Sequence, residues 1–379
     1  MPPGSASTAS QPIRVALVAP TLAILGGHAV QAQQMLNGWR GDPAVHPWLV
    51  PINPTPRAPL HRLQQIKYVR TVVTQAVYWP LLVRELRRAD LAHVFSASST
   101  GFLLSTVPAV VVARLVGTPV LLNYHSGDAP AHLAGSRLAR LVTRRLSALV
   151  VVPSRFLRDV FARFGVPAQV VFNSIDLLRF GYRARTPLRA RLLSTRNLDD
   201  PYNVACTLRA FARVQAMHPE ASLTIVGTGP HAAALQQLAR DLALRHVTFT
   251  GRVAPDDMPR YYAEHDIYVQ TPSFDNMPLS VLEAFASGLP VVSTRVGGVP
   301  AILTDGEHGL LADENDDAGI AAQVMALLAN PDRARTMAAA AYASCHPYEW
   351  QQVRQGWLSA YRHALQGADR RTPVPVAAS

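Results

Sequence analysis

The sequence predicts an α/β protein of two domains, each a parallel sheet with helices on both faces. The chain has 379 residues, more than one hydrophobic core normally supports. Short apolar runs alternate along it with longer helical segments, which is typical of parallel sheets. Hydrophobic residues make up 49% of the chain and charged residues 16%, so the composition favours well-buried domains over disorder.

The first predicted domain spans residues 13–182. It begins with an apolar strand at 13–19, a loop at 20–27 and a helix at 28–38, the order in which nucleotide-binding folds begin. The segment 51–88 shows no clean alternation, and we assign no element to it. Further strands are expected at 91–95, 120–123, 148–152 and 169–172.

The second predicted domain spans residues 188–345. A stretch with Pro and Arg at 180–187 marks the expected hinge. A last helix at 346–366 is expected to return to the first domain, and residues 1–12 and 367–379 are expected to be flexible tails. Strands of the second domain are expected at 191–194, 223–226, 247–249, 267–270, 291–293 and 309–311.

Charge is unevenly distributed along the chain. Residues 1–185 contain 20 Lys and Arg against six Asp and Glu, whereas residues 186–379 contain 16 against 19. A basic first half favours contact with something anionic, such as a phosphorylated lipid or the cytoplasmic membrane surface. No interleaved aromatic platform or known motif supports nucleic-acid binding.

Two segments of the first half mix basic and apolar residues in the manner of a membrane-facing surface. Each also fits a solvated basic face over a normal buried stripe. The first contains Leu63, Ile66, Lys67, Arg70, Tyr78, Trp79, Arg84, Arg87 and Arg88, and the second contains Arg137, Leu138, Arg140, Leu141, Arg144, Arg145 and Leu146.

Several classes of protein lack their sequence signatures here. Cys206 and Cys345 are far apart, so neither a disulfide framework nor a zinc site is indicated, and a reducing cytoplasm fits. The start of the chain lacks the basic and apolar segments of a secretory signal. The apolar run 102–116 is interrupted by Pro108 and Arg114 and is shorter than the roughly 20 residues that span a bilayer, so we predict no transmembrane helix.

Two carboxylates, Asp275 and Glu283, lie eight residues apart in the most informative segment of the chain. Pro278 suits the first turn of a helix, and Gly288 followed by Pro290 closes it, so Asp275 precedes a short helix that contains Glu283. Unpaired N–H groups at the start of a helix form a cradle for a phosphate group, and two carboxylates suit sugar hydroxyls. A solvated Glu and an Asp that merely caps the helix would show the same spacing.

Other candidate residues directly follow predicted strands, where ligands bind in parallel sheets. Gly26 and Gly27 follow the first strand and would let backbone N–H groups approach a phosphate, or serve a tight turn. His28 belongs either to the same place or to a helix cap. His125 follows the strand at 120–123 and is either functional or a satisfied structural histidine. Arg196 follows the strand at 191–194, and its planar fork suits a diphosphate.

The segment around Asp275 and Glu283 resembles the acidic-x7-Glu signature of the retaining glycosyltransferases of family 4. That family has the GT-B fold, in which two Rossmann-like domains, one for the acceptor and one for the nucleotide-sugar donor, face each other across a cleft. The resemblance covers roughly residues 13–365 and rests mainly on motifs between 194 and 311. Gly227 and Gly229 resemble the family's glycine turn near the nucleotide, although a plain turn would look the same.

The resemblance implies a role for each candidate residue. Glu283 would bind the ribose, Asp275 the donor sugar, and Arg196 the leaving diphosphate. The rest of the implied donor site consists of His125, Gly26, Gly27, Gly227, Gly229 and the stretch Asn276, Met277, Pro278 and Leu279. The chain departs from the family at two places: Asp275 stands where the family usually has Glu, and the family's Lys a few residues after Arg196 is absent. Tyr202 or Asn203 would supply a neutral donor there.

The expected function is transfer of a hexosyl unit from a nucleotide sugar, with uridine as the base by family frequency, to a lipid-linked or saccharide acceptor in cell-envelope or exopolysaccharide synthesis. Retention of anomeric configuration follows from the resemblance. No Asp-x-Asp triplet occurs, so no metal or other cofactor is expected. The expected location is the cytoplasm or the inner face of its membrane. A nucleotide-sugar epimerase of the same fold and a degenerate nucleotide-sugar binder remain as alternatives.

Overall fold

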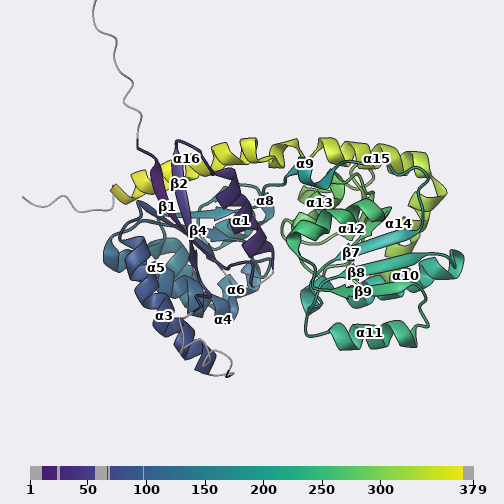
Figure 1. The fold of residues 1–379 in the computed structure, drawn as a ribbon, viewed down its shortest axis with the longest axis horizontal. Helices are drawn as coiled ribbons and strands as arrows, with labels where there is room; N and C mark the ends of the chain where they lie inside the picture. Colours follow the sequence, from purple (N-terminus) through teal and green to yellow (C-terminus); the bar gives the residue numbers. More distant parts are fainter. Residues whose placement is uncertain (1–10, 24–25, 56–65, 67–68, 97, 370–379) are drawn as a thin grey trace, which may run out of the picture. The chain divides into compact units, whose positions relative to one another are not determined.

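The protein is described by a computed structural model that covers residues 11–23, 26–55, 66, 69–96 and 98–369. The chain forms two compact units. Unit 1 contains the chain up to Val152, Arg158–Val171 and the chain from Arg354 onward, and unit 2 contains Pro153–Leu157 and Phe172–Val353. The expectation of two α/β units is confirmed (Figure 1). The predicted tails lie mostly outside the described residues.

Unit 1 is built on a parallel six-stranded sheet with the order β2-β1-β3-β4-β5-β6. Its strands are β1 (Ile13–Ala19), β2 (Val45–Pro51), β3 (Leu91–Ser96), β4 (Val120–Tyr124), β5 (Leu149–Val152) and β6 (Ala168–Val170). Its helical elements are α1 (Gly27–Gly38), α3 (Val69–Leu86), α4 (Ser99–Gly101), η1 (Phe102–Thr106), α5 (Val107–Val116), α6 (Ala129–Gly135), α7 (Arg137–Leu141), η2 (Val142–Leu146), α8 (Arg155–Arg163), and α16 (Trp350–Asp369) from Arg354 onward.

Two elements of unit 1 were not anticipated from the sequence. Strand β2 pairs with β1 along seven residues although it contains Pro47 and Pro51. Proline cannot donate to a ladder and suits an edge strand, which is the position of β2. Helix α3 occupies much of the segment 51–88 and contains Pro80. Prolines in both elements obscured the patterns that predict strands and helices.

Unit 2 repeats the architecture with the order β12-β11-β10-β7-β8-β9. Its strands are β7 (Arg191–Thr195), β8 (Ser222–Val226), β9 (Val247–Gly251), β10 (Ile267–Val269), β11 (Val291–Thr294) and β12 (Leu310–Ala312). Its helical elements are α9 (Leu177–Phe180), η3 (Asp200–Tyr202), α10 (Val204–Met217), α11 (Ala232–Asp241), η4 (Pro255–Asp257), α12 (Met258–Glu264), α13 (Leu279–Ala286), η5 (Val299–Ala301), α14 (Asp317–Ala329), α15 (Pro331–Ala343) and η6 (His346–Tyr348).

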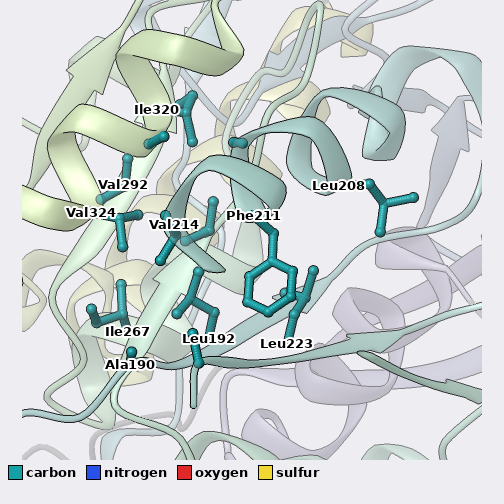
Figure 2. Packing of buried hydrophobic residues seen from close by; sticks show 14 of the residues in the cluster. Ala190, Leu192, Leu208, Phe211, Val214, Leu223, Ile267, Val292, Ile320 and Val324 are labelled. Atoms are coloured by element: carbon teal, nitrogen blue, oxygen red, sulfur yellow. The ribbon is translucent and has the colours of Figure 1, made fainter. Parts of the chain in front are cut away.

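Alternate side chains of the unit 2 strands enter two separate hydrophobic clusters. Leu192 and Ile267 pack with helices α10, α11 and α14 in the cluster of Figure 2. Their neighbours Leu193 and Tyr268 pack with α9, α12 and α13. Because successive residues of a strand point to opposite faces, both faces of the sheet are buried. The apolar runs that predicted these strands are a direct consequence.

The boundary between the units differs from the predicted hinge at 180–187. Residues from Phe172 onward belong to unit 2, because the Ile175 amide donates to the carbonyl of Tyr348 at 2.9 Å and Phe180 is buried against α12 and α13. The chain returns to unit 1 at Arg354, within α16. There the Tyr361 hydroxyl hydrogen-bonds with Nδ1 of His93 at 3.0 Å.

Strand order reverses once in each sheet. In unit 1 the chain adds β2 on one side of β1 and β3 on the other, and in unit 2 it adds β8 on one side of β7 and β10 on the other. In open parallel sheets, ligands bind at the carboxyl ends of the strands beside such a reversal. The residues that follow β1, β3, β7 and β10 are therefore the first place to look for a functional site.

One helical stretch, 99–116, is long and apolar enough to cross a membrane by length and composition alone, as judged over the described residues. It is partly buried in unit 1, where Phe102, Ala109, Val110, Val112 and Ala113 are inaccessible to solvent. A core helix of a soluble protein meets the same criterion. The expectation that the chain contains no transmembrane helix stays a prediction.

Candidate active site

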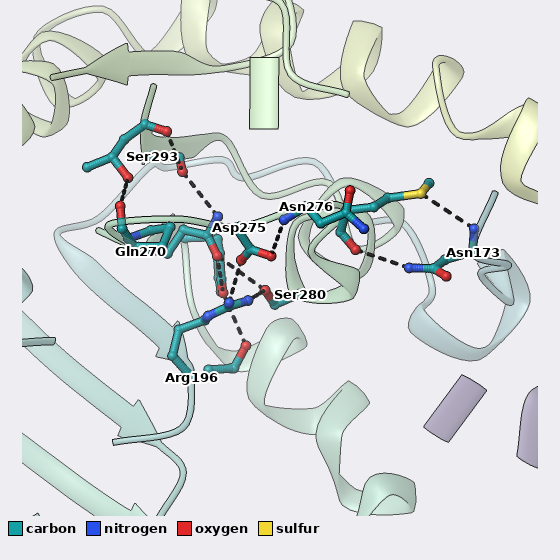
Figure 3. Close-up of polar contacts among 12 residues, drawn as sticks. Asn173, Arg196, Gln270, Asp275, Asn276, Ser280 and Ser293 are labelled. Carbon is teal, nitrogen blue, oxygen red and sulfur yellow. Dashed lines mark hydrogen bonds and ion pairs between the residues drawn. The ribbon is translucent and has the colours of Figure 1, made fainter. Parts of the chain in front are cut away.

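In unit 2 the structure brings Arg196, Asp275 and Glu283 to the carboxyl edge of the sheet beside the reversal. Arg196 directly follows β7, Asp275 follows β10, and Glu283 lies in α13. The Arg196 guanidinium forms an ion pair with the carboxylate of Asp275, and its Nη1 donates to Oγ of Ser280 at 2.9 Å (Figure 3). The sequence placed these residues in one site, and their mutual pairing is a finding of the structure.

Arg196 is a buried cation whose hydrogen-bonding capacity is not filled. Its side chain is 9% exposed and that of Asp275 is 14% exposed. Burial alone would lower the pKa of Arg196, but the Asp275 carboxylate together with Tyr202 and Tyr268 outweighs burial and the pKa is raised, so the guanidinium stays charged. Its Nε–H is buried without a hydrogen-bond partner among the described residues. An unsatisfied buried donor costs about 1–3 kcal/mol, which an anionic acceptor would relieve.

Glu283 is held by a chain of hydroxyl groups that the sequence did not reveal. The Tyr262 hydroxyl donates to Oε2 of Glu283 at 2.7 Å and lies 2.7 Å from Oγ1 of Thr195, the neighbour of Arg196. Burial raises the pKa of Glu283, and the bond from Tyr262 with the charges of Arg179 and Arg196 opposes this. The carboxylate that belongs to the motif is thus fixed in orientation. No spacing or motif links Tyr262 with Glu283.

Glycines hold the two site loops in place by close backbone contact. A Cβ on Gly227 would lie 2.1 Å from the carbonyl oxygen of Arg196, and one on Gly229 would lie 2.2 Å from that of Leu198. A Cβ on Gly297 would likewise lie 2.0 Å from the carbonyl oxygen of Asp275, and one on Gly298 would lie 1.9 Å from that of Asn276. The sequence left open whether Gly227 and Gly229 form a plain turn or contact the nucleotide. The structure shows that both pack closely against neighbouring backbone, and contact with the nucleotide stays a prediction.

The predicted phosphate cradle at 276–279 needs correction in its details. Pro278 is the N-cap residue of α13 and not part of its first turn, and it has no N–H to donate. The Met277 side chain is buried, and its carbonyl oxygen accepts from Nδ2 of Asn173 at 3.1 Å. The Asn276 amide already donates to Oδ1 of Asp275 at 2.8 Å. These contacts fix the loop before the helix, and Asp275 in this loop pairs with Arg196.

Unit 1 gathers the other predicted residues at its own strand reversal. A Cβ on Gly26 or Gly27 would meet no atom within 4 Å, so this turn borders open space. The ring centroids of His28 and His125 lie 5.3 Å apart, and Phe95 stacks on His125 at 5.5 Å. Burial lowers the pKa of His28 to about 4, and burial with the nearby His28 and His93 lowers that of His125 well below 6.5. Both imidazoles are neutral at pH 7.

The chemistry of the two groups of residues is therefore different. Unit 2 offers a buried cation, two carboxylates and hydroxyl groups, which suit a phosphate and sugar hydroxyls together. Unit 1 offers neutral imidazoles beside an open glycine turn, which suit uncharged hydroxyls. Among the described residues, no group of three or more His, Cys, Asp or Glu side chains is arranged to hold a metal ion.

Two family models match this chain. The model "Glycosyltransferase Family 4" matches residues 25–179, and the model "Glycosyl transferases group 1" matches residues 189–330. The first match covers the glycine turn and His125, and the second covers Arg196, Asp275 and Glu283. Both candidate groups of residues thus lie inside the matched regions.

Two proteins with similar sequences are also named as transferases of sugars. The chain is 26% identical over 308 residues to the sulfoquinovosyl transferase of Arabidopsis thaliana, covering 75% of this chain and 59% of that protein. It is 32% identical over 230 residues to the GDP-mannose-dependent alpha-(1-6)-phosphatidylinositol monomannoside mannosyltransferase of Mycolicibacterium smegmatis, covering 54% of this chain and 59% of that protein. The chain therefore spans less than two thirds of the length of these relatives.

A similar solved structure is that of Anabaena HepE in complex with UDP and glucose. The TM-score is 0.73 at 16% identity, and the match covers 92% of this chain and 99% of that chain. At this identity the likeness shows the fold alone. The expected two-domain GT-B fold is confirmed.

Proposed function

Because the chain belongs to the family 4, group 1 glycosyltransferases, we propose that it transfers a hexosyl unit from a nucleotide sugar to an acceptor hydroxyl, with retention of anomeric configuration. The observation that supports this most is Arg196, a buried guanidinium with an unpaired Nε–H at the strand reversal of unit 2. A nucleoside diphosphate supplies the anionic oxygens that such a donor lacks. Glu283 lies in the same site and would accept from the ribose hydroxyls.

In the proposed reaction the bond between the anomeric carbon and the β-phosphate oxygen breaks. Arg196 stabilises the charge that develops on the departing diphosphate, which is the role of a preorganised donor in the transition state. The acceptor oxygen bonds to the anomeric carbon on the same face, and its proton passes to the departing phosphate oxygen. Asp275 would hold the sugar hydroxyls once the diphosphate takes its place on Arg196. We assign His125 and the turn at Gly27 to the same donor.

The donor base is proposed to be uridine. The HepE structure contains UDP, whereas the mycobacterial relative is named for GDP-mannose, so the two comparisons point to different bases. Calorimetric titration with UDP, GDP and ADP decides between them. We expect one nucleotide to bind, and Glu283→Gln to weaken it roughly ten- to a hundredfold, since a hydrogen bond to a charged group contributes about 1.5–3 kcal/mol. If Glu283→Gln bound the nucleotide as tightly as the wild type, Glu283 could not be assigned to the ribose.

Product analysis separates this function from the two alternatives. Incubation with the donor and a panel of lipid-linked and saccharide acceptors should give a glycoside, and NMR of its anomeric proton should show the configuration of the donor. An epimerase would change the donor sugar with no acceptor present. A degenerate binder would bind the nucleotide and give no product in either assay.

A lipid-linked acceptor is supported by an exposed apolar patch on unit 1. It consists of Val72 and Trp79 of α3 with Leu103 and Leu104 of η1, all exposed large hydrophobic residues. Gln75 joins the two elements, because its Nε2 donates to the carbonyl oxygen of Leu104 at 2.8 Å and its Oε1 accepts from the Trp79 indole at 3.1 Å. Contiguous exposed apolar residues mark interaction surfaces, and an exposed Trp suits a membrane–water interface.

Part of the first predicted membrane segment does not face outward. Tyr78 is fully buried, with its hydroxyl donating to the carbonyl oxygen of Ser105 at 3.0 Å. Arg84 and Arg88 both pair with Glu85, a carboxylate that is itself almost fully buried. The mixed composition of the segment reflects a helix with one packed face. The proposed membrane contact therefore rests on the exposed residues Val72 and Trp79 of this helix.

The second segment fits the proposal better. Leu138 and Leu141 of α7 are exposed beside arginines that include Arg144, so these leucines do not form a buried stripe. Leu63 and Lys67 of the first segment lie outside the described residues.

Co-sedimentation with vesicles tests the membrane proposal. We expect the protein to bind vesicles of phosphatidylcholine with phosphatidylglycerol, and to bind pure phosphatidylcholine less well, with salt weakening the anionic component. Replacing Trp79 and Leu103 by Ser should reduce binding severalfold. Leu178→Ser, on an exposed leucine of unit 2, is the matched control. Equal binding by both variants would contradict the proposed surface.

A further inference from the structure

Tyr202 covers one face of the Arg196 guanidinium. It ends the short 3-10 turn η3, and its ring centroid lies 4.1 Å from Cζ of Arg196. The edge of the same guanidinium is bonded to Asp275 and Ser280. Arg196 is therefore held in two independent ways, along its edge by hydrogen bonds and on its face by an aromatic ring.

The loop that carries Tyr202 is tied to the segment that carries Asp275. The Ser273 amide donates to the carbonyl oxygen of Pro201 at 2.9 Å, and the Thr271 hydroxyl donates to that of Asn203 at 2.8 Å. Asn203 has a φ of 45°, a left-handed conformation that Asn tolerates better than most residues and that turns the chain from η3 into α10. The Tyr202 ring on the face of the guanidinium and the Asp275 carboxylate at its edge are thus held by two loops that are hydrogen-bonded to each other.

Burial raises the pKa of Tyr202, and the charge of Arg196 opposes this, so the phenol is neutral at physiological pH. A neutral ring adds no positive charge to the site. Its contribution is geometric, because a stacked plane restricts rotation of the guanidinium while leaving its N–H groups free to bond in their own plane.

We propose that Tyr202 is a positioning residue that keeps the Arg196 guanidinium in its plane when a nucleoside diphosphate displaces the Asp275 carboxylate. This inference rests on the proposed function. When the donor enters, the edge contacts of Arg196 must be exchanged, and the Tyr202 stack is the contact that persists through the exchange. The guanidinium then meets the diphosphate already oriented, which favours the transition state without a second cation.

The test compares substitutions that keep or remove the ring. Tyr202→Phe keeps the stack but removes the hydroxyl that the sequence offered as a neutral donor. It should stay within about threefold of the wild-type kcat, because the inference assigns positioning to the ring and not to the hydroxyl. Tyr202→Leu should lower kcat roughly tenfold or more with a smaller effect on KM. Tyr261→Leu is the matched control, because Tyr261 stacks on the exposed Arg260 at 5.3 Å in the same unit. Equal activity of Tyr202→Phe and Tyr202→Leu would overturn the inference.

A double-mutant cycle separates positioning from a general structural effect. In an Arg196→Lys background there is no guanidinium plane to orient, so Tyr202→Leu should have little further effect on kcat. Additive effects would overturn the inference even if Tyr202→Leu alone is slow or unstable. The wild-type protein is also titrated with UDP and GDP. If it binds neither nucleotide, the proposed function and this inference are both overturned. If it binds one of them but the effects of the Arg196 and Tyr202 substitutions on kcat are additive, this inference alone is overturned.

Discussion

The two units have the same sheet architecture, yet the residues at their strand reversals are stabilised by different forces. In unit 2 the buried charges of Arg196 and Asp275 compensate each other. In unit 1 the imidazoles of His28 and His125 are neutral and pack against each other and Phe95. A buried charge must be paired, whereas a neutral ring only needs contact and a partner for its nitrogens. One architecture thus supports a charged and an uncharged site.

The glycine turns at the two strand reversals also differ, because the backbone is tightly packed in unit 2 and open in unit 1. The glycines of unit 2 press against neighbouring carbonyl oxygens, so the site loops are tightly fixed. The glycine turn of unit 1 borders open space. A rigid charged site suits a ligand whose phosphates must be oriented, and an open neutral turn suits a part of the ligand that varies. Substitutions in the two units should therefore have unlike effects.

The largest effect is expected from Arg196→Ala. It removes the charged side chain that we assign to the diphosphate and leaves the Asp275 carboxylate without its cation. We expect kcat to fall roughly 100- to 1,000-fold, the loss typical of a transition-state donor. Steady-state kinetics with the donor that binds will measure it, and Arg335→Ala, on an exposed arginine paired with Asp332, is the control. A loss below tenfold would place the diphosphate elsewhere.

The glycines provide a direct comparison of the two units. In Gly298→Ala the new Cβ would lie 1.9 Å from the carbonyl oxygen of Asn276, so we expect a loss of about 1–3 kcal/mol in the free energy of unfolding and a displaced Asp275 loop. In Gly27→Ala the Cβ meets no atom within 4 Å, so stability should be kept while turnover falls. Thermal denaturation and kinetics on both variants check this. Equal destabilisation would refute the contrast between open and tight turns.

A smaller effect is expected from pH, and a buried histidine of unit 1 should contribute to it. Because burial lowers the pKa of His28 to about 4 from 6.5, the unfolded chain binds a proton between these values that the folded chain does not. The free energy of unfolding should therefore fall as the pH is lowered from 6.5 to 4. His28→Gln should flatten this dependence in thermal denaturation.

The control for this pH series is His363→Gln, on an exposed histidine of α16. Other histidines remain in the His28 variant and keep part of the slope, since burial lowers the pKa of each. They are His93, His125 and His132 of unit 1 and His265 of unit 2. A slope that stays unchanged in His28→Gln would mean that His28 is protonated alike in the folded and unfolded chain.

The smallest effect, within error of none, is expected from metal removal. The proposed reaction neutralises the diphosphate with Arg196, so chelation with EDTA should leave kcat unchanged. The matched measurement adds Mg²⁺ or Mn²⁺ back to the treated protein. A loss of activity on chelation that Mn²⁺ restores would show that the charge balance of unit 2 is completed by a metal.

Much of the fold could be predicted because its signals are local. Strand β1 was predicted at 13–19, the range in which it occurs, since its core is a run of inaccessible residues. Strand β2 was missed because its prolines break the apolar pattern, and only pairing with β1 makes it a strand. The hinge was placed too late because the contacts of Ile175 and Phe180 with unit 2 come from distant parts of the chain.

The sequence by itself determined two parallel α/β units, the strand ends after which Arg196, Asp275 and His125 lie, and the short helix that contains Glu283. Apolar periodicity, helix-capping residues and the residues that follow a strand are properties of short segments. Only the tertiary structure decided the partners of these groups. The Arg196–Asp275 pair joins residues 79 positions apart, and the Tyr262–Glu283 bond depends on how α12 and α13 pack on one face of the sheet. Such contacts follow from strand order and helix packing, which no local pattern encodes.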